Sequence, residues 1–235
     1  MKIPVLSYHS ISDDNSKLSL SVKDFEQQMF YLKKLNYETT TFSDIDNKKK
    51  KIIITFDDGY KDVLVNALPI LKKFNFNATC FLVTNSLGSF NRWDKNKMNY
   101  KNKEIMNLEE VKEWIDSGMF IGSHTHNHLD LTTLSNEDII NELRISKTFI
   151  KNKFDINVDV FCYPYGKVNL SVFNLTKKFY KNAVTTNRAR YDTNIHNALL
   201  IPRIDMGKKI SYFKLCLKLK TIYEDIKFNH NELYM

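Results

Sequence analysis

A strongly apolar run that ends in two adjacent carboxylates constrains the fold of this chain more than any other stretch. Residues 52–56 read Ile-Ile-Ile-Thr-Phe, and Asp57, Asp58 and Gly59 follow directly. These apolar and β-branched residues favour a buried strand, and Asp-Asp-Gly is where a strand must stop. A parallel strand that delivers carboxylates at its carboxyl end is typical of sites in α/β proteins. A solvated turn also suits Asp-Gly, and the stretch alone does not decide between the two.

Strand-like and helix-like segments alternate along the chain. No linker rich in proline, glycine or serine interrupts them, which predicts a single α/β domain over residues 1–235, built as a distorted (β/α) barrel. We expect its core at about residues 3–206 and a C-terminal amphipathic helix at about 209–228. The predicted strands are 3–9, 37–42, 52–56, 78–83, 119–123, 158–163, 183–186 and 198–205, and the other predicted helices are 21–35, 63–74, 108–117, 135–154 and 168–180.

Residues 84–107 form the longest stretch without a regular pattern. This segment is rich in asparagine and lysine and contains Trp93. A loop of this length inside a compact domain is usually functional or mobile. Trp93 is therefore a candidate lid or a platform for a ring of the ligand, because aromatic rings stack on the flat faces of such rings. An aromatic anchor that packs the loop down is an equal alternative.

The basic charge of the chain indicates a solvated surface before it indicates a partner. The formal net charge is +8 at pH 7, but the lysines are spread along the chain and no nucleic-acid-binding motif occurs. We therefore expect no nucleic-acid partner. The C-terminal helix is basic and amphipathic, which is compatible with peripheral contact with a membrane, although packing against the domain is the commoner role. These features do not predict an oligomeric state.

Cysteine usage and the amino terminus predict a cytoplasmic protein. Cys80, Cys162 and Cys216 are far apart and lie in apolar segments, as reduced, buried thiols do. The first residues enter a strand and become polar at Ser7, without the apolar stretch of a signal peptide. No run of about 18 apolar residues, the length of a membrane-spanning helix, occurs elsewhere.

Polar groups suited to catalysis collect where the predicted strands end. In a parallel barrel the carboxyl ends of the strands lie on one face, so these groups are expected to meet in space. Four of the six histidines fall at such ends. The groups are His9, Asp57-Asp58, the block Ser123–His128, the block Tyr163–Gly166 and the block Arg203–Asp205.

The histidines of the block Ser123–His128 suggest a metal site. On a helical turn His124 and His128 share a face while His126 points away, but in an extended segment all three would share a face. Spacing alone therefore does not select the pair, and a polar turn with surface histidines is the alternative. With a carboxylate from a neighbouring strand, two histidines leave an open position for water, which is the arrangement of catalytic zinc.

Adjacent aspartates would solve a problem that a hydrolase with one metal faces. One carboxylate is needed to hold the ion, and a second is needed to take a proton from the bound water. Neighbouring side chains of a strand point to opposite faces, but a turn at Gly59 can break that alternation. Both carboxylates can then reach one pocket from different directions.

Three motifs stand in a characteristic order: TFDDGY at Thr55–Tyr60, SHTHNH at Ser123–His128 and FCYPYG at Phe161–Gly166. Together they resemble the signatures of the polysaccharide deacetylases, the NodB-homology enzymes of carbohydrate esterase family 4. The resemblance spans about residues 3–206. It implies the distorted barrel of that family and a metal-dependent hydrolase that removes N-acetyl groups from an amino sugar in a glycan or glycan precursor.

The resemblance also implies a role for each matching residue. Asp57 would be the general base. Asp58, His124 and His128 would bind a divalent metal, with zinc as the default and cobalt, nickel or iron as alternatives. Tyr165, which follows Pro164 in the third motif, would contribute its backbone N–H to the oxyanion hole, and both residues would contact the substrate.

Two departures from the family pattern leave roles to be filled. The motif arginine that orients the catalytic aspartate is replaced by Cys162, and Arg203 is a candidate substitute by position only. The late motif that carries the catalytic-acid histidine has no histidine here. The start Ser7–Ile11 is similar to that of the permuted branch, the poly-β-1,6-N-acetylglucosamine deacetylases, which implies that His9 is the general acid. A hydrogen-bonded histidine at a strand end is the alternative for His9.

Other functions are compatible with the same residues. A deformylase or an O-deacetylase would use the same metal site, and a glycan-binding relative without activity is a third alternative, suggested by Cys162. The partner expected in each case is a saccharide, N-acetylated for the main prediction. The identity of the sugar is not predictable from the sequence.

Overall fold

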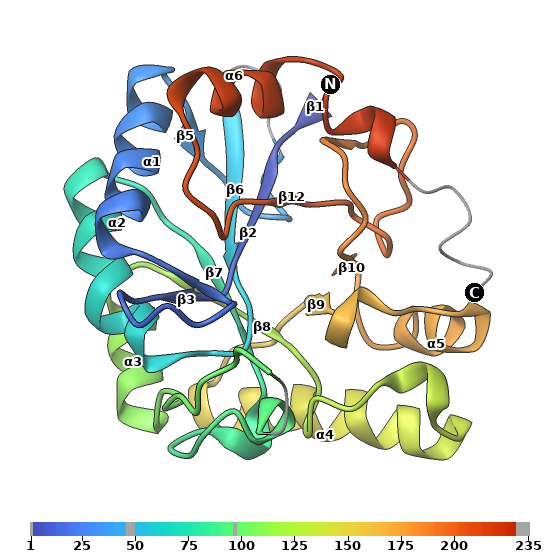
Figure 1. Ribbon diagram of the computed structural model, residues 1–235. Helices are drawn as coiled ribbons and strands as arrows, with labels where there is room; N and C mark the ends of the chain where they lie inside the picture. The colour runs from blue at the N-terminus through green and yellow to red at the C-terminus, as the bar shows by residue number, and fades with distance from the viewer. Residues whose placement is uncertain (1, 46–49, 96–97, 229–235) are drawn as a thin grey trace.

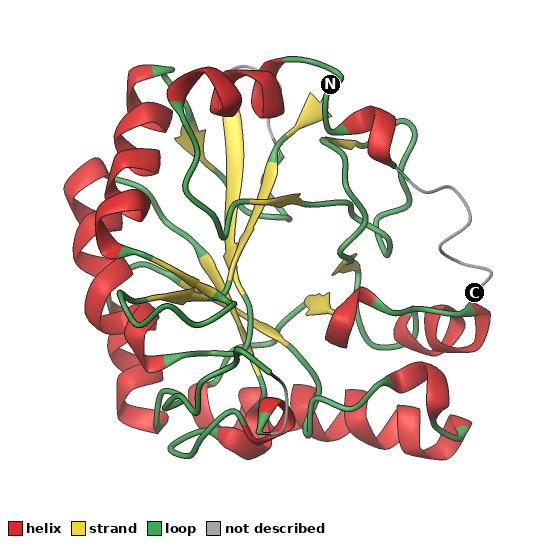
Figure 2. Ribbon diagram, viewed as in Figure 1, coloured by secondary structure: helices red, strands yellow, loops and turns green. Residues whose placement is uncertain are grey.

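A curled sheet of parallel strands lies at the centre of the computed structural model, which describes residues 2–45, 50–95 and 98–228. The helices surround this sheet (Figure 1, Figure 2). Every strand pair within it is parallel. Across the sheet the strands are β10 (Asn182–Val184), β9 (Val160–Cys162), β8 (Phe120–Ser123), β7 (Thr79–Leu82), β6 (Lys51–Phe56), β2 (Val5–Tyr8) and β12 (Ile204–Asp205), and β5 (Glu38–Thr39) pairs with the start of β6.

Residues 198–205 connect the two edges of the sheet, and we call them the closing segment. Ile201 forms a parallel bridge with Val184 of β10, and three residues later Ile204 pairs with Leu6 of β2. The segment therefore crosses from the last strand of the sheet to the first, as the course of β12 in Figure 1 shows. The predicted α/β barrel is confirmed in the form of a curled half-barrel that this segment spans.

The outer helices begin where the sequence places capping side chains. The Ser21 hydroxyl accepts from Asp24 N at the start of α1, and the Ser135 hydroxyl accepts from Asp138 N at the start of α4. Asn107 and Glu110 form a reciprocal capping box at α3. The helices are α1 (Val22–Lys34), α2 (Leu68–Phe74), α3 (Leu108–Asp116), α4 (Asn136–Phe154), α5 (Leu170–Thr176) and α6 (Tyr212–Lys220).

Several elements are shorter than the sequence predicts. The strand expected at 37–42 is reduced to β5, and that expected at 198–205 is a bridge followed by the two residues of β12. The C-terminal helix ends at Lys220 because Thr221 is extended, and only a helical turn at Asp225–Lys227 follows. This break lets the buried Glu224 turn inward and pair with Lys218 and Arg188.

Two additional sheets have two strands each. β1 (Lys2–Ile3) pairs antiparallel with β11 (Tyr191–Asp192), and β3 (Ser10–Ile11) pairs in parallel with β4 (Ser19–Leu20). The first brings the amino terminus beside the segment that follows β10. The second lies immediately after β2, so it adjoins the carboxyl end of the main sheet.

The irregular segment 84–107 is anchored on the same end of the sheet. Its residues Phe90 and Glu104 form an antiparallel bridge, and Ile105 bridges Tyr60 just after β6. Asn91 is buried, donates to Lys101 O and accepts from Lys103 N. These bonds fold the segment back on itself, so that it packs beside the end of β6.

A small apolar cluster fills the inside of the curl. It includes Phe81, Val184 and Ile201, all of them buried. Gly122 of β8 faces this cluster, and a Cβ atom there would lie 2.5 Å from Phe81 Cδ1 and 3.1 Å from Val160 Cγ1. The interior therefore has no room for even one additional methyl group at this position.

We predict that Gly122→Ala destabilises the protein by about 1–3 kcal/mol, because the added methyl group overpacks the inside of the curl. The free energy of unfolding from urea denaturation measures the effect. Gly207→Ala is the matched control, since its nearest neighbour would be Asp205 Oδ1 at 3.4 Å. Equal stability of the two variants would contradict the tight packing of the interior.

Candidate active site

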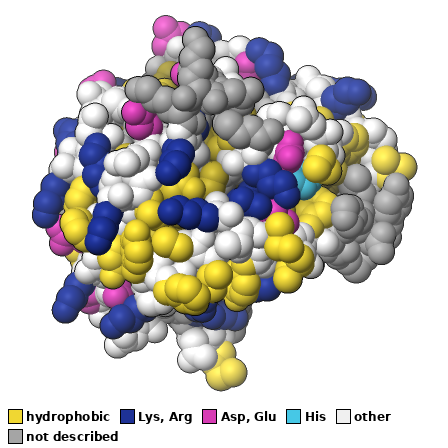
Figure 3. Space-filling view, turned by 90° about the horizontal axis from the view of Figure 1, so that it is seen from above, with side chains coloured by type: hydrophobic (Ala, Val, Ile, Leu, Met, Phe, Trp, Pro, Cys, Tyr) yellow, Lys and Arg dark blue, Asp and Glu magenta, His cyan; other side chains and the backbone are white. Residues whose placement is uncertain are grey.

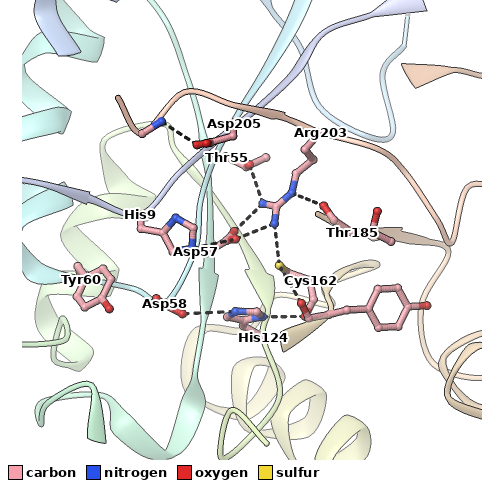
Figure 4. A network of polar contacts seen from close by, with 12 residues as sticks. His9, Thr55, Asp57, Asp58, Tyr60, His124, Cys162, Thr185, Arg203 and Asp205 are labelled. Atoms are coloured by element: carbon pink, nitrogen blue, oxygen red, sulfur yellow. Dashed lines mark hydrogen bonds and ion pairs between the residues drawn. The ribbon is translucent and has the colours of Figure 1, made fainter. Parts of the chain in front are cut away.

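Strand ends from across the curled sheet line one pocket of about 440 Å³. His9 follows β2, Asp57 and Asp58 follow β6, and His124 follows β8. Figure 4 shows these side chains directed toward one another from their separate strands. The strand ends thus meet, as expected from the sequence, and Tyr165 also lines the pocket.

Asp58, His124 and His128 form a compact set of metal-ligating groups. His124 Nε2 and His128 Nε2 each lie 3.4 Å from Asp58 Oδ1, and one ligand atom from each residue lies within 4.8 Å of the others. All three side chains are buried. Two imidazoles and one carboxylate fit a divalent metal with a remaining position for water, so the donor set matches a catalytic site.

The orientation of His124 supports metal binding. Its Nδ1 lies 2.7 Å from the backbone carbonyl oxygen of Cys162. A carbonyl can only accept, so Nδ1 carries a hydrogen, and Nε2 is directed toward Asp58, where a metal ion would take the place of its proton. A hydrogen bond of this kind fixes the tautomer and the ring of a metal-binding histidine.

The turn that carries the histidines has an unusual backbone. Thr125 and His128 both have positive φ angles, +67° and +57°, although neither is a glycine. The Thr125 hydroxyl accepts from His128 N at 2.9 Å. Because of this turn, His124 and His128 converge, whereas His126 Nδ1 lies 2.9 Å from the Thr84 hydroxyl. Between the two arrangements that spacing allowed, the chain therefore adopts the one that separates His126 from the other two.

Glu142 of α4 holds this turn in place. Its buried carboxylate accepts from His126 N at 2.9 Å, from Asn127 N at 2.8 Å and from Asn127 Nδ2 at 2.5 Å. Sequence analysis did not identify Glu142. The signal was present, however, since a glutamate stands on the apolar face of the helix near Ile139 and Leu143, where a buried carboxylate needs polar partners.

Arg203 of the closing segment engages Asp57 with both ends of its guanidinium. Nη1 donates to Asp57 Oδ1 and Nη2 donates to Oδ2, each at 2.7 Å, and both side chains are buried. Burial alone would raise the pKa of the Asp57 carboxyl, but Arg203, with His9 and His124, holds that pKa below its usual value. Asp57 is therefore ionised at neutral pH.

The remaining donors of Arg203 are also satisfied. Nε donates to Thr185 O at 2.9 Å and Nη1 donates to the Thr55 hydroxyl at 3.1 Å. Nη2 also lies 3.4 Å from Cys162 Sγ. Cys162, at the position of the motif arginine, therefore touches the guanidinium that pairs with Asp57, and burial raises the pKa of its thiol. Figure 4 shows the whole network.

His9 lines the same pocket as the metal-ligating groups. Its Nε2 is 3.8 Å from Asp57 Oδ2, and its side chain is 32% exposed, whereas that of Asp57 is 4% exposed. His9 can therefore reach both the carboxylate and a molecule that enters from solvent. Pro164 is buried and does not line the pocket, so the predicted contact of Pro164 with substrate has no support from the geometry.

Aromatic rings frame the mouth of the pocket. Trp93 stacks on His128 with ring centroids 4.5 Å apart, and Tyr165 makes an edge-on contact with the same ring at 4.7 Å. Trp93 is half-buried and Tyr165 is 40% exposed. Tyr165 adopts a positive φ of +60°, and Gly166 is pressed against Thr186, where a Cβ atom would not fit. The ring of Trp93 therefore both packs the irregular segment down and faces the pocket.

The fold, the motifs and the site are all of the kind found in one protein family, and comparison with known proteins identifies that family. The model of the polysaccharide deacetylase family matches residues 44–184, and the chain belongs to this family.

Three related proteins illustrate the similarity. YxkH of Bacillus subtilis (strain 168), assigned by its name to the polysaccharide deacetylases, is 34% identical over 194 residues, which are 79% of this chain and 64% of that protein. A poly-beta-1,6-N-acetyl-D-glucosamine N-deacetylase of Staphylococcus aureus (strain MSSA476) is 28% identical over 73% of this chain and 62% of its own. The structure of the Streptococcus pyogenes deacetylase PplD in complex with acetate superposes with a TM-score of 0.79 at 26% identity, covering 94% and 99% of the two chains.

The chain spans somewhat less than two thirds of the length of the two curated relatives. Within the part of the chain that the structure describes, no helix has both the length and the apolar character needed to cross a bilayer.

We predict that Glu142→Ala lowers the affinity of the metal-free protein for zinc by about 10-fold or more, because three donors of the histidine turn lose their acceptor. Competition with a chromophoric chelator measures that affinity without any substrate. Glu137→Ala, on the exposed first turn of the same helix, is the control. Unchanged zinc affinity in a folded Glu142→Ala protein would exclude this role for Glu142.

We predict that Arg203→Met lowers the free energy of unfolding at pH 7 by about 3–5 kcal/mol, because it leaves the Asp57 carboxylate buried without a cation. The folded-state pKa of Asp57 is depressed in the native protein, so the stabilisation is fully present above about pH 4 and is lost as the pH falls through that lower pKa. The deficit of the variant should therefore shrink in acid.

Urea denaturation between pH 3 and 8 measures this difference. Adding Asp57→Asn to Arg203→Met should recover part of the stability, since no unpaired charge remains. Arg144→Met, at an exposed position of α4, is the control. A stability deficit that does not change with pH would show that Arg203 acts through packing and not through its charge.

Proposed function

We propose that the chain is a metal-dependent hydrolase that removes N-acetyl groups from amino sugars of a glycan or glycan precursor. One observation carries the proposal: two adjacent carboxylates have separate partners. Asp57 pairs with a guanidinium at 2.7 Å, and Asp58 lies 3.4 Å from each of two imidazole nitrogens. The relatives include a protein named as an N-deacetylase of a β-1,6-linked N-acetylglucosamine polymer, which supports the same chemistry.

Asp58, His124 and His128 would hold the metal, with zinc as the expected ion and cobalt, nickel or iron as alternatives. When bound, a divalent ion supplies a Lewis acid that lowers the pKa of water and polarises an amide carbonyl.

Asp57 is suited to act as the general base. Its carboxylate is ionised, buried and held by two parallel hydrogen bonds, so its position and charge do not depend on solvent. A depressed pKa weakens a base, but it also keeps every molecule in the proton-accepting form at neutral pH. Arg203 would therefore be a positioning residue, which aims the carboxylate and keeps it charged.

His9 is suited to protonate the departing amine. It lines the same pocket, lies 3.8 Å from Asp57 Oδ2 and is open to solvent over part of its ring. An amide held in the pocket would then have both the acid and the base within reach. The backbone N–H of Tyr165, in a turn with positive φ, would stabilise the tetrahedral oxyanion.

Two other activities would use the same groups. A deformylase would act on a smaller acyl group. An O-deacetylase would depend less on protonation by His9, because an alkoxide leaves more easily than the nitrogen anion of an amide. PplD is named a deacetylase and its structure contains acetate, which favours acetyl as the group that is removed. Initial rates on N-acetylated, N-formylated and O-acetylated glucosamine oligosaccharides distinguish the three activities.

We predict that Asp57→Asn lowers deacetylation by about 10²–10⁴-fold while zinc still binds, because Asp57 is not a ligand. His9→Ala should cost at least about 10²-fold for an amide substrate. Acetate release and zinc content measure the two properties separately. His196→Ala, beside β11 and outside the pocket, is the control for loss of an imidazole. Near-native turnover by Asp57→Asn would refute the assignment of the base, and a protein that binds zinc but releases no acetyl group from any substrate would indicate a glycan-binding role.

A further inference from the structure

The segment that carries α6 has an uneven charge. Residues 206–223 contain five lysines and neither aspartate nor glutamate. Lys218 is buried, donates to Asp205 O at 2.8 Å and pairs with Glu224 at 3.0 Å. The other four, Lys208, Lys209, Lys214 and Lys220, are exposed.

The inner face of α6 accounts for its packing against the protein. Leu215 and Leu219 are buried, at 0% and 2% exposure, and α6 contacts α1. The Gln28 side chain of α1 donates to Lys208 O at 3.0 Å and ties the start of this segment down. These contacts explain why the inner side of α6 is apolar, but they do not involve its outer side.

The outer face of α6 combines apolar and basic side chains. Phe213 is 72% exposed. Leu217, one turn later, is half-buried, and Lys214 and Lys220 flank these two residues. A phenylalanine this exposed gains nothing from the fold, because most of its ring remains in water.

Side chains of α1 extend this face. Tyr212 packs on Tyr31 with ring centroids 5.1 Å apart, and Lys34 Nζ lies 5.3 Å from the centre of the Tyr212 ring. Phe30, beside Tyr31, is 48% exposed. We call Phe30, Tyr31, Lys34, Tyr212, Phe213, Lys214, Leu217 and Lys220 the α1/α6 face. Figure 3, which looks down on this end of the molecule, shows hydrophobic side chains with lysines and arginines among and around them.

We propose that the α1/α6 face binds the surface of a bilayer that contains anionic lipids. Aromatic rings and lysines are the side chains that settle at the boundary between acyl chains and charged headgroups. Two carboxylates of the neighbouring segments are already neutralised: Glu26 pairs with Lys73 at 2.6 Å, and Asp225 pairs with Arg190 and Lys2 at 2.6 Å. The face therefore presents positive charge to a negative surface.

Charge also argues against a second copy of the chain as the occupant. A two-fold interface would place the face against itself and bring its lysines together. Like charges across a contact are unfavourable. An anionic surface instead complements every exposed lysine of the face.

Binding in this way would set the orientation of the catalytic pocket. In Figure 1, α6 lies near the end of the sheet where β6 begins, and Asp57 and Asp58 follow the other end of β6. The pocket would then be away from the lipid surface. A glycan attached to or released from the membrane could reach the pocket without displacing the helix.

The test is sedimentation of the whole chain with vesicles, in about 0.1 M salt. We expect binding to vesicles of phosphatidylcholine with phosphatidylglycerol, weaker binding at higher salt, and little binding to phosphatidylcholine alone. A polarity-sensitive dye on Cys216 reports insertion, since Cys216 is half-buried on α6 while Cys80 and Cys162 are buried. The dye emission should shift to the blue only with the anionic vesicles.

Two variants distinguish this proposal from a general charge effect. Lys214→Glu combined with Lys220→Glu should lower the vesicle partition coefficient by about 25-fold or more, at about fivefold per lysine. Lys177→Glu combined with Lys178→Glu, with the same charge change on an exposed part of the chain after α5, should have little effect. Phe213→Ser should cost about tenfold, whereas Leu170→Ser, at a residue 61% exposed, should cost nothing.

Four results would overturn the proposal. The first is an absence of binding to anionic vesicles at low salt. The second is equal loss in the test and control variants. The third is concentration-dependent dimerisation in light scattering that Phe213→Ser abolishes, which would assign the face to a second copy. Equal competition by soluble dextran sulfate and by vesicles, with no shift in dye emission, would assign it to an anionic polymer. None of these measurements uses a substrate, so their outcome is independent of the proposed function.

Discussion

The paired hydrogen bonds between Arg203 and Asp57 are the interaction on which the rest of the site depends. They join the closing segment to the end of β6, and they take place between two side chains that are almost wholly buried. Neither charge could remain there alone, because an unpaired buried ion costs several kcal/mol. The guanidinium therefore determines both the shape of this end of the barrel and the charge state of the carboxylate. Its other bonds, to Thr185 O just after β10 and to the Thr55 hydroxyl within β6, connect one more strand end to the same group.

The second carboxylate has a different environment because the backbone turns between the two. Asp58 has a φ of +73°, so the chain leaves the strand conformation directly after Asp57. Asp58 is thereby directed to His124 and His128 instead of the guanidinium. Positive φ angles recur at His128 and Tyr165, which line the same pocket, and at Thr125 in the turn that carries His128. Such conformations persist only where surrounding contacts impose them, and Glu142 is the clearest source of those contacts for the histidine turn.

Local patterns made much of the fold and part of the site predictable. Alternating strands and helices, together with Ser21 and Ser135 as caps, indicate the α/β order, and polar residues at strand ends indicate where the pocket lies. Spacing could not show that His126 is directed away, because that depends on positive φ angles at Thr125 and His128. The apolar face of α4 could have marked Glu142 as a buried carboxylate, but not its partners in the histidine turn. The pairing of Arg203 with Asp57 spans 146 residues, and the two edges joined by the closing segment meet only in the folded chain.

The position of Arg203 along the chain has a consequence for the order in which contacts form during folding. Asp57 and its counter-ion Arg203 are 146 residues apart, so this contact forms late if the chain folds as it leaves the ribosome. The region that matches the family model ends at residue 184 and includes the carboxylate without the guanidinium. A nascent chain of that length already contains both aspartates, His124 and His128, but it lacks the cation that compensates the burial of Asp57. Burial of an ionised Asp57 therefore has to wait until the closing segment brings Arg203 to it.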